Sequence, residues 1–169
     1  TLSYSWKGSV KIPESFENHH VLDESGNVIP LQRTEEGVFA LVKLESLSFT
    51  TFKKGESVIN NLETDNKLSL ENNLVRYVFD DKGALISAYD KELEKEFMAG
   101  IGNVLSLYED RPNNWDAWDV DFFYREALIE TAEMIHASGH SNGSVLQQLK
   151  FEFKIGNSSV QQLVSLNPL

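Results

Sequence analysis

The stretch "LKFEFKI" spans Leu149–Ile155 and alternates strictly between apolar and charged side chains. Such a period of two predicts a β-strand with one buried face and one solvated face. "GNSS" (Gly156–Ser159) follows as a turn, and "VQQLVSL" (Val160–Leu166) resumes an extended pattern. The sequence therefore predicts an antiparallel hairpin at this point.

Further strand and turn signals recur at short intervals along the rest of the chain. The predicted strands are rich in β-branched and aromatic residues and lie at Val38–Leu44, Leu47–Phe52, Leu74–Phe79 and Ala84–Tyr89. "DESGN" (Asp23–Asn27) and "DDKG" (Asp80–Gly83) are predicted turns, in which Gly accommodates a positive φ. We therefore expect a mainly β protein of antiparallel β-sandwich architecture, in which a small N-terminal β-domain precedes the start of a larger β-sandwich.

Two segments contain helix-forming residues instead. "DKELEKEFM" (Asp90–Met98) fits a short helix with Asp90 as its N-cap. "REALIETAEMIHA" (Arg125–Ala137) has helix formers throughout, yet its apolar positions match neither the helical nor the strand period. From the residues alone, the conformation of this second segment stays open.

A polar, Asn-rich stretch at Lys54–Lys67 separates two β-rich blocks. We place one domain at 1–58 and a second at 66–169. The chain lacks an initiator Met and stops directly after an alternating apolar stretch, so we expect a fragment of a larger protein, with the first domain truncated at its N-terminus.

The composition excludes several classes of partner. The chain has 169 residues, a formal net charge of −11 and no clustered Lys and Arg, so we expect no nucleic-acid partner. No apolar run approaches the roughly 20 residues of a bilayer span, so we expect no membrane partner. The absence of cysteine excludes disulfides and thiolate metal sites, and it fits a cytoplasmic location.

"RPNNWDAWDVD" (Arg111–Asp121) places two of the chain's three tryptophans among three aspartates. Aromatic faces stack on the C–H surfaces of sugars, and carboxylates accept hydrogen bonds from their hydroxyls. The candidate substrate-binding residues are Trp115, Asp116, Trp118 and Asp119. The alternative is structural, because Trp often anchors a core and loop Asp often caps a turn.

The sequence shows no catalytic constellation and no convincing metal motif. His136 and His140 have the spacing of a shared metal on a helix, but Ser138 and Gly139 between them would weaken a helix. We expect no metal ligands here. No Ser-His-Asp signature, phosphate loop or dinucleotide fingerprint is present, so we assign no catalytic residue.

One family resemblance covers nearly the whole chain. "LSLYEDRPNNWDAWDVDFFY" (Leu105–Tyr124) closely resembles a segment of bacterial α-mannosidases of glycoside hydrolase family 38. Leu70–Met98 resembles the entry into the large C-terminal β-sandwich region of that family. Leu2–Pro13 looks like the opening of the smaller preceding β-domain, and Val21–Gln32 fits the same domain.

The resemblance implies a retaining α-mannosidase whose nucleophile and zinc ligands lie in a preceding α/β domain. This chain would then carry no cofactor, and zinc is expected in the absent catalytic domain. The resemblance also implies that Arg125–Ala137 is mostly strand.

The implied role is a non-catalytic β-sandwich portion that supports the catalytic domain and lends a Trp/Asp loop to the active-site rim. Its partners would be an α-mannoside and the catalytic domain of the same polypeptide. Two alternatives remain: a stand-alone carbohydrate-binding β-sandwich module, or a structural scaffold with the Trp-Asp segment packed inside.

Overall fold

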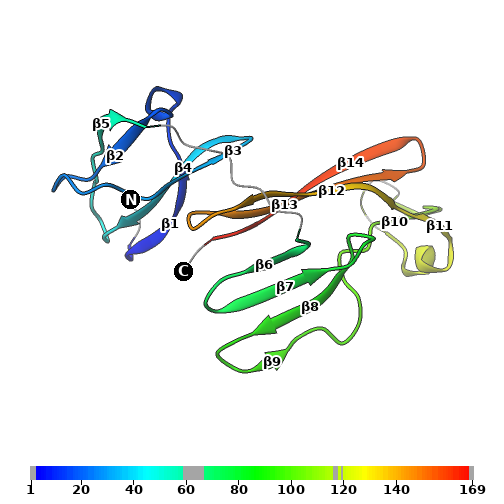
Figure 1. Ribbon diagram of the computed structural model, residues 1–169. Helices are drawn as coiled ribbons and strands as arrows, with labels where there is room; N and C mark the ends of the chain where they lie inside the picture. The colour runs from blue at the N-terminus through cyan, green and yellow to red at the C-terminus, as the bar shows by residue number, and fades with distance from the viewer. Residues whose placement is uncertain (1–2, 59–66, 116–117, 119, 168–169) are drawn as a thin grey trace.

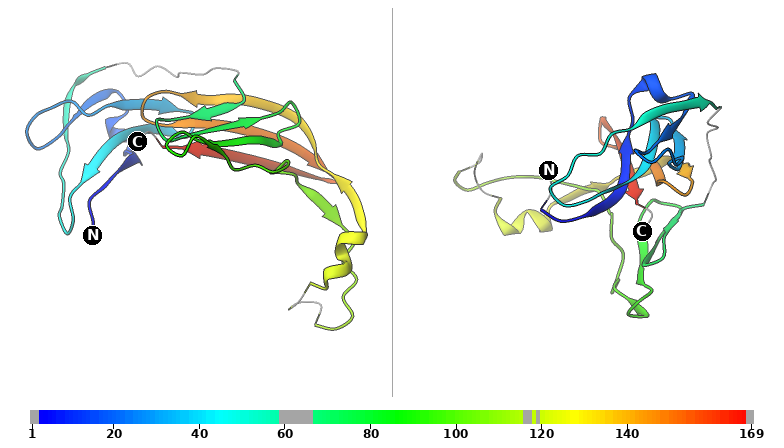
Figure 2. Two further views of the ribbon diagram at one scale, coloured as in Figure 1. Left: turned by 90° about the horizontal axis from the view of Figure 1, so that it is seen from below. Right: turned by 90° about the vertical axis from the view of Figure 1, so that its left-hand side faces the viewer.

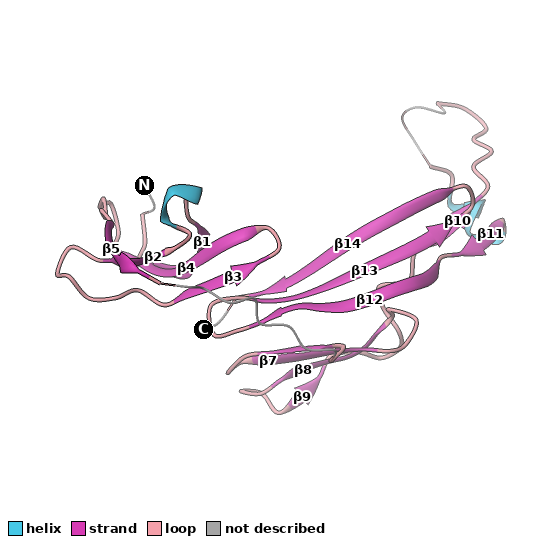
Figure 3. Ribbon diagram, turned by 45° about the horizontal axis from the view of Figure 1, so that its top comes forward, coloured by secondary structure: helices cyan, strands magenta, loops and turns pink. Residues whose placement is uncertain are grey.

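The computed structural model describes residues 3–58, 67–115, 118 and 120–167, and these residues form antiparallel sheets joined by loops and two short 3₁₀ helices (Figures 1 and 3). Within these ranges there is no α-helix, which confirms the prediction of a mainly β protein. None of the described helices has the length and apolarity needed to cross a membrane.

The N-terminal part contains one three-stranded sheet, ordered β1-β4-β3, and one two-stranded sheet, β2-β5. Its elements are β1 (Trp6–Lys11), η1 (Glu14–Phe16), β2 (His19–Leu22), β3 (Leu31–Thr34), β4 (Gly37–Leu44) and β5 (Lys53–Ser57). Val21 of β2 and Ala40 and Val42 of β4 form a small buried core with Ile29, which precedes β3.

The C-terminal part is built on two sheets, ordered β6-β7-β8-β9 and β12-β13-β14, with a smaller pair β10-β11 at one end (Figure 1). Its elements are β6 (Ser69–Glu71), β7 (Val75–Phe79), β8 (Leu85–Asp90), β9 (Lys95–Glu96), β10 (Ser106–Tyr108), η2 (Phe122–Glu126), β11 (Leu128–Thr131), β12 (Glu133–Asn142), β13 (Gln147–Ile155) and β14 (Ser158–Leu166).

The two larger sheets pack face to face, as in a β-sandwich. Leu149, Phe151 and Phe153 of β13 meet Leu70 of β6 and Phe79 of β7 in one buried cluster. The rings of Phe151 and Phe79 lie 5.1 Å apart between centroids. The apolar alternation of Leu149–Ile155 therefore supplies the sandwich core, as the sequence predicts.

The predicted hairpins form with the expected turn chemistry. β13 and β14 pair from Gln147↔Leu166 to Ile155↔Ser158, and Gly156 turns the chain at φ 55°. In the turn between β7 and β8, the Asp80 carboxylate accepts the backbone N–H groups of Lys82 and Ala84 at 2.9 and 2.8 Å. Side-chain bonds of this kind fix a tight turn without help from the sheet.

The predicted strand at Leu47–Phe52 is wrong. This stretch is a loop, and the strand β5 begins at Lys53 instead. The backbone N–H of Thr51 donates to the Glu24 carboxylate at 3.1 Å, which ties the stretch to the Asp23–Asn27 turn rather than to a sheet. A segment with high β propensity becomes a strand only where a neighbouring strand pairs with it, and Leu47–Phe52 belongs to none of the described sheets.

The two segments rich in helix formers are not α-helical. At the end of β8, the Asp90 carboxylate accepts the N–H groups of Glu92 and Leu93, so the chain makes a turn and enters β9. The helix considered for Asp90–Met98 is therefore wrong. Arg125–Ala137 is mostly strand, as expected, because β12 pairs with β13 along most of its length.

The two parts are joined by a buried contact that we call the Gln32 joint, formed by Gln32, Gly143, Val145 and Leu146. The Gln32 side chain leaves β3 and is 5% exposed. Its Nε2 donates to the Leu146 carbonyl at 2.5 Å, and its Oε1 accepts the N–H groups of Val145 and Leu146 at 2.8 and 2.9 Å. A Cβ at Gly143 would overlap the Gln32 amide.

The boundary between the two predicted domains, 1–58 and 66–169, falls at residues 59–66, which lie outside the described ranges. These domain limits therefore stay a prediction.

We expect an acid-sensitive contact at the edge of the β8-β9 pair. The Glu96 carboxylate accepts the Ser87 hydroxyl at 2.6 Å and the N–H groups of Met98 and Ala88 at 2.9 and 2.8 Å. These bonds, that from Ser87 first, lower the pKa of Glu96 from 4.5 to about 2. Because the folded pKa is depressed, the stabilisation is present above 4.5 and is lost as the pH falls toward 2.

The Ser87→Ala variant tests this contact. We expect it to move the pKa of Glu96 back toward 4.5, as read from an NMR titration of the side-chain carboxyl carbon. The matched control is Ser159→Ala, at an exposed serine of β14. A pKa of Glu96 that stays near 2 in Ser87→Ala would contradict the assignment.

Candidate functional site

The segment with the candidate residues is a loop between β10 and η2, residues 109–121, which we call the Trp loop. It projects beyond the end of the long sheet β12-β13-β14 (Figure 2, left). Two contacts close its base: the rings of Tyr108 and Tyr124 meet edge to face at 5.1 Å, and the Glu109 N–H donates to the Ala127 carbonyl at 2.9 Å. These contacts hold the loop at its base, and the described indoles of Trp115 and Trp118 lie outside the core.

Within the loop, short-range hydrogen bonds set the backbone. The Asn113 N–H donates to the Asp121 carboxylate at 2.9 Å, and the Trp118 N–H donates to the Trp115 carbonyl at 2.7 Å. Trp115 has a φ of 64°, a left-handed conformation that is uncommon for a bulky residue. Such a conformation costs about 1–3 kcal/mol in a non-glycine residue, and Leu47, Glu94 and Asn103 also adopt it in turns and loops of this chain.

Both described indoles face solvent. Trp115 is 77% exposed and Trp118 is 91% exposed, and the two line an open recess of about 470 Å³. Val120 and Phe122 beside them are also exposed. A Trp side chain buries 150–250 Å² when covered, so a cluster of this kind indicates a surface that meets a ligand or another part of a protein.

The arrangement can stack on the apolar face of a ring, because both indoles offer flat, exposed π surfaces. The structural alternative, in which the tryptophans anchor this chain's core, is wrong for both described indoles. Asp116 and Asp119 lie outside the described residues, so their assignment as ligands of a substrate stays a prediction. The nearby Asp121 has a different role, because its carboxylate closes the loop on Asn113.

The described ranges contain no cluster of metal-ligating side chains. Among these residues, no group of three or more His, Cys, Asp and Glu side chains is placed to hold an ion. His136 lies on β12, opposite Glu152 of β13, and the side chain of His140 is not described. The expectation that this chain carries no metal stays a prediction.

Comparison with known families identifies the part of the chain that carries the Trp loop. The sequence profile described as "Glycosyl hydrolases family 38 C-terminal domain" matches residues 70–169. The chain belongs to this family. The family 38 C-terminal domain thus includes most of β6, all later strands, the sandwich core and the Trp loop. The expected family is confirmed.

Two curated relatives match a shorter stretch. The family 38 chain is 36% identical over 66 residues to Alpha-mannosidase 2C1 of Homo sapiens and, over the same length, to Alpha-mannosidase 2C1 of Mus musculus. The aligned stretch is 38% of this chain and 6% of each relative. The chain therefore spans only a small part of the length of the curated relatives it matches.

Sequence reasoning missed the residues that hold the Trp loop in place. Tyr108 and Tyr124 flank the loop of the family 38 domain on either side, and their edge-to-face contact closes it. An aromatic residue on each side of a Trp-rich loop is a signal that could have predicted this closure. Phe122, whose side chain is 80% exposed beside the indoles, was likewise not predicted as part of the site.

Proposed function

We propose that this chain is the non-catalytic β-sandwich portion of a retaining α-mannosidase that hydrolyses terminal α-mannosyl residues. Its role is to support the catalytic domain and to lend the Trp loop to the rim of the active site. The observation that carries the proposal is the exposure of Trp115 and Trp118 on a projecting loop of a family 38 domain. Two exposed indoles on a loop that is held at its base can stack on a sugar ring.

The energetics support a contact rather than a permanently solvated surface. At about 25 cal/mol per Å², covering half of one indole stabilises a complex by about 2–3 kcal/mol. Asp116 and Asp119 complete the proposed rim as acceptors for sugar hydroxyls.

The catalytic chemistry belongs, in this proposal, to another domain of the same polypeptide. The aspartate nucleophile and the zinc are placed there, so that the partners of this chain are the catalytic domain and the α-mannoside. The absence of cysteine supports the proposed cytoplasmic location.

We expect the isolated 169-residue chain to be inactive and free of stoichiometric zinc. The reason is that no residue of the chain matches the nucleophile or the metal ligands that the family resemblance implies. An aryl α-mannoside assay and elemental analysis of the purified chain measure both properties, and a far-UV spectrum typical of β-structure is the folding control. Turnover above background that a chelator abolishes would contradict the proposal.

A second candidate function is a stand-alone carbohydrate-binding module, which the exposed indole pair also favours. The two proposals differ in the behaviour of the isolated chain. A rim loop without its opposite wall should give no saturable change of tryptophan fluorescence with α-mannobiose. A stand-alone module should give a saturable change that the Trp118→Ala variant removes.

A further inference from the structure

Asp121, the last of the three aspartates in the Trp-rich segment, links the Trp loop to the short helix η2. It directly precedes η2, the yellow helix beside the loop in Figure 2 (left). Its backbone carbonyl accepts the Tyr124 N–H at 3.1 Å, so its main chain belongs to the start of that helix. Its carboxylate accepts the Asn113 N–H at 2.9 Å, on the opposite arm of the loop. One residue therefore bridges the two arms.

The direction of this carboxylate is unusual for its position in the chain. An aspartate at a helix N-cap ordinarily accepts a backbone N–H of the first helical turn. Asp121 has the extended backbone of an N-cap, with φ −62° and ψ 135°, but its side chain makes no capping bond to η2. The carboxylate crosses to Asn113 instead. Asp121 therefore uses its charge to close the loop rather than to cap the helix.

The bond between Asn113 and Asp121 encloses both described tryptophans. The two bonded residues are eight positions apart, and Trp115 and Trp118 lie between them. Inside the closed segment, the Trp118 N–H donates to the Trp115 carbonyl at 2.7 Å, which joins the backbones of the two stacking residues. A segment whose ends are held together has fewer accessible conformations than an open one. The Asp121 carboxylate therefore restricts where the two indoles can lie.

Packing does not hold the indoles in place, because Trp115 is 77% exposed and Trp118 is 91% exposed. Side chains with few buried contacts keep their freedom of motion unless the backbone beneath them is fixed. The ring contact and the backbone bond at the base of the loop lie outside residues 113–121. The bond of Asp121 crosses the loop closer in sequence to the indoles than these base contacts do.

A binding surface that is ordered before the ligand arrives does not pay the cost of ordering on binding. We propose that Asp121 is a positioning residue of the Trp loop, whose carboxylate holds the Trp115 and Trp118 pair in the arrangement that stacks on the sugar. This inference rests on the proposed function of the loop. Asp121 acts through the backbone at Asn113 and needs no contact with the α-mannoside.

Steady-state kinetics of the full-length enzyme test the effect on binding. Stacking is present in the ground state and the transition state alike, so its weakening raises KM and leaves kcat unchanged. We expect the KM of an α-mannoside to rise about 3- to 10-fold in Asp121→Ala. Asp121→Asn keeps an oxygen that can accept the Asn113 N–H, so its KM should rise less than about 2-fold. The matched control is Asp81→Ala, which removes the same charge from the exposed β7–β8 turn and should leave KM unchanged.

A second readout reports the order of the loop without reference to catalysis. The full-length enzyme carries 5-fluorotryptophan at position 118, and its ¹⁹F NMR resonance is recorded for each Asp121 variant. We expect the resonance to shift and narrow in Asp121→Ala, because the indole samples more conformations. Asp121→Asn should retain the wild-type signal, and the melting temperature of each variant is the folding control.

An unchanged ¹⁹F resonance in Asp121→Ala would overturn the proposal, and so would an unchanged KM in a protein whose Trp118→Ala variant is impaired. Equal impairment of Asp121→Asn and Asp121→Ala would also overturn it, because the charge rather than the bond to Asn113 would then matter. Failure of the proposed function has a different signature, namely an unchanged kcat/KM in Trp118→Ala itself.

Discussion

Replacing Phe151 with alanine should lower the free energy of unfolding by about 3–5 kcal/mol. The Phe151 side chain is 0% exposed and lies in the central strand of the sheet β12-β13-β14. Its ring contacts Phe79 of the facing sheet at 5.1 Å and Phe153 of its own strand at 6.0 Å between centroids. The truncation leaves a cavity between the two sheets, and the sheets cannot move close enough together to fill it.

Urea denaturation of the wild type and of Phe151→Ala measures this difference. The matched control is Phe49→Ala, because the Phe49 ring is 88% exposed in a loop, and its loss should change stability by less than about 0.5 kcal/mol. Equal stability losses in the two variants would mean that the two sheets do not share the core described above.

Replacing Gln32 with alanine should cost about 2–5 kcal/mol, because one amide satisfies three buried backbone groups. The carbonyl of Leu146 and the N–H groups of Val145 and Leu146 would lose their partners in a segment that is 0–4% exposed. Each unsatisfied buried group costs about 1–3 kcal/mol, and the three costs are not additive. Urea denaturation and amide exchange at Val145 and Leu146 measure the loss.

Gly143→Ala provides a sharper test of the same joint. Its new Cβ would overlap the Gln32 amide, so we expect a loss of about 1–3 kcal/mol in the wild-type background. In the Gln32→Ala background the space is free, and the same substitution should cost little. Additive losses in this double-mutant cycle would contradict the proposed contact.

The parts of the fold that the sequence predicts are those whose signals are local. The alternation through Leu149, Phe151 and Phe153 predicts the core strand because its period alone assigns one face to the interior. The Asp80–Gly83 turn is predictable because its hydrogen bonds stay within the turn. Leu47–Phe52 fails as a strand because its backbone bonds to Glu24, 27 residues away from Thr51.

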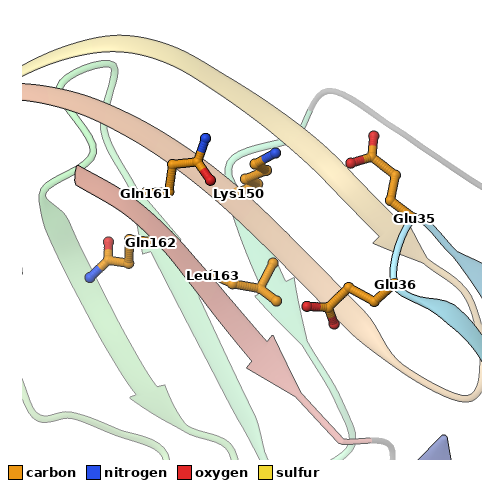
Figure 4. A pocket seen from close by; sticks show the side chains of 6 residues that line it. All are labelled: Glu35, Glu36, Lys150, Gln161, Gln162 and Leu163. Atoms are coloured by element: carbon orange, nitrogen blue, oxygen red, sulfur yellow. The ribbon is translucent and has the colours of Figure 1, made fainter. Parts of the chain in front are cut away.

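Long-range contacts account for what the sequence could not predict. Gln32 and Leu146 are 114 positions apart, and no pattern in either segment indicates that they meet. An open groove lined by Glu36, Lys150 and Gln161 likewise brings the β3–β4 turn beside β13 and β14, and no local pattern predicts it (Figure 4).

Composition and resemblance together select the Trp loop, but only the structure shows that Trp115 and Trp118 are exposed rather than buried. A Trp-rich segment can serve a core or a surface equally well, and the sequence period does not distinguish them.

The most direct test of the proposed role is the kcat/KM of the full-length enzyme with Trp118→Ala. The 91% exposed indole contributes little to folding, so the melting temperature should stay unchanged. The loss of about 2–3 kcal/mol of stacking should lower kcat/KM for an α-mannoside about 30- to 160-fold, with Phe49→Ala unchanged as the control. An unchanged kcat/KM in Trp118→Ala would contradict the role of the Trp loop at the active-site rim.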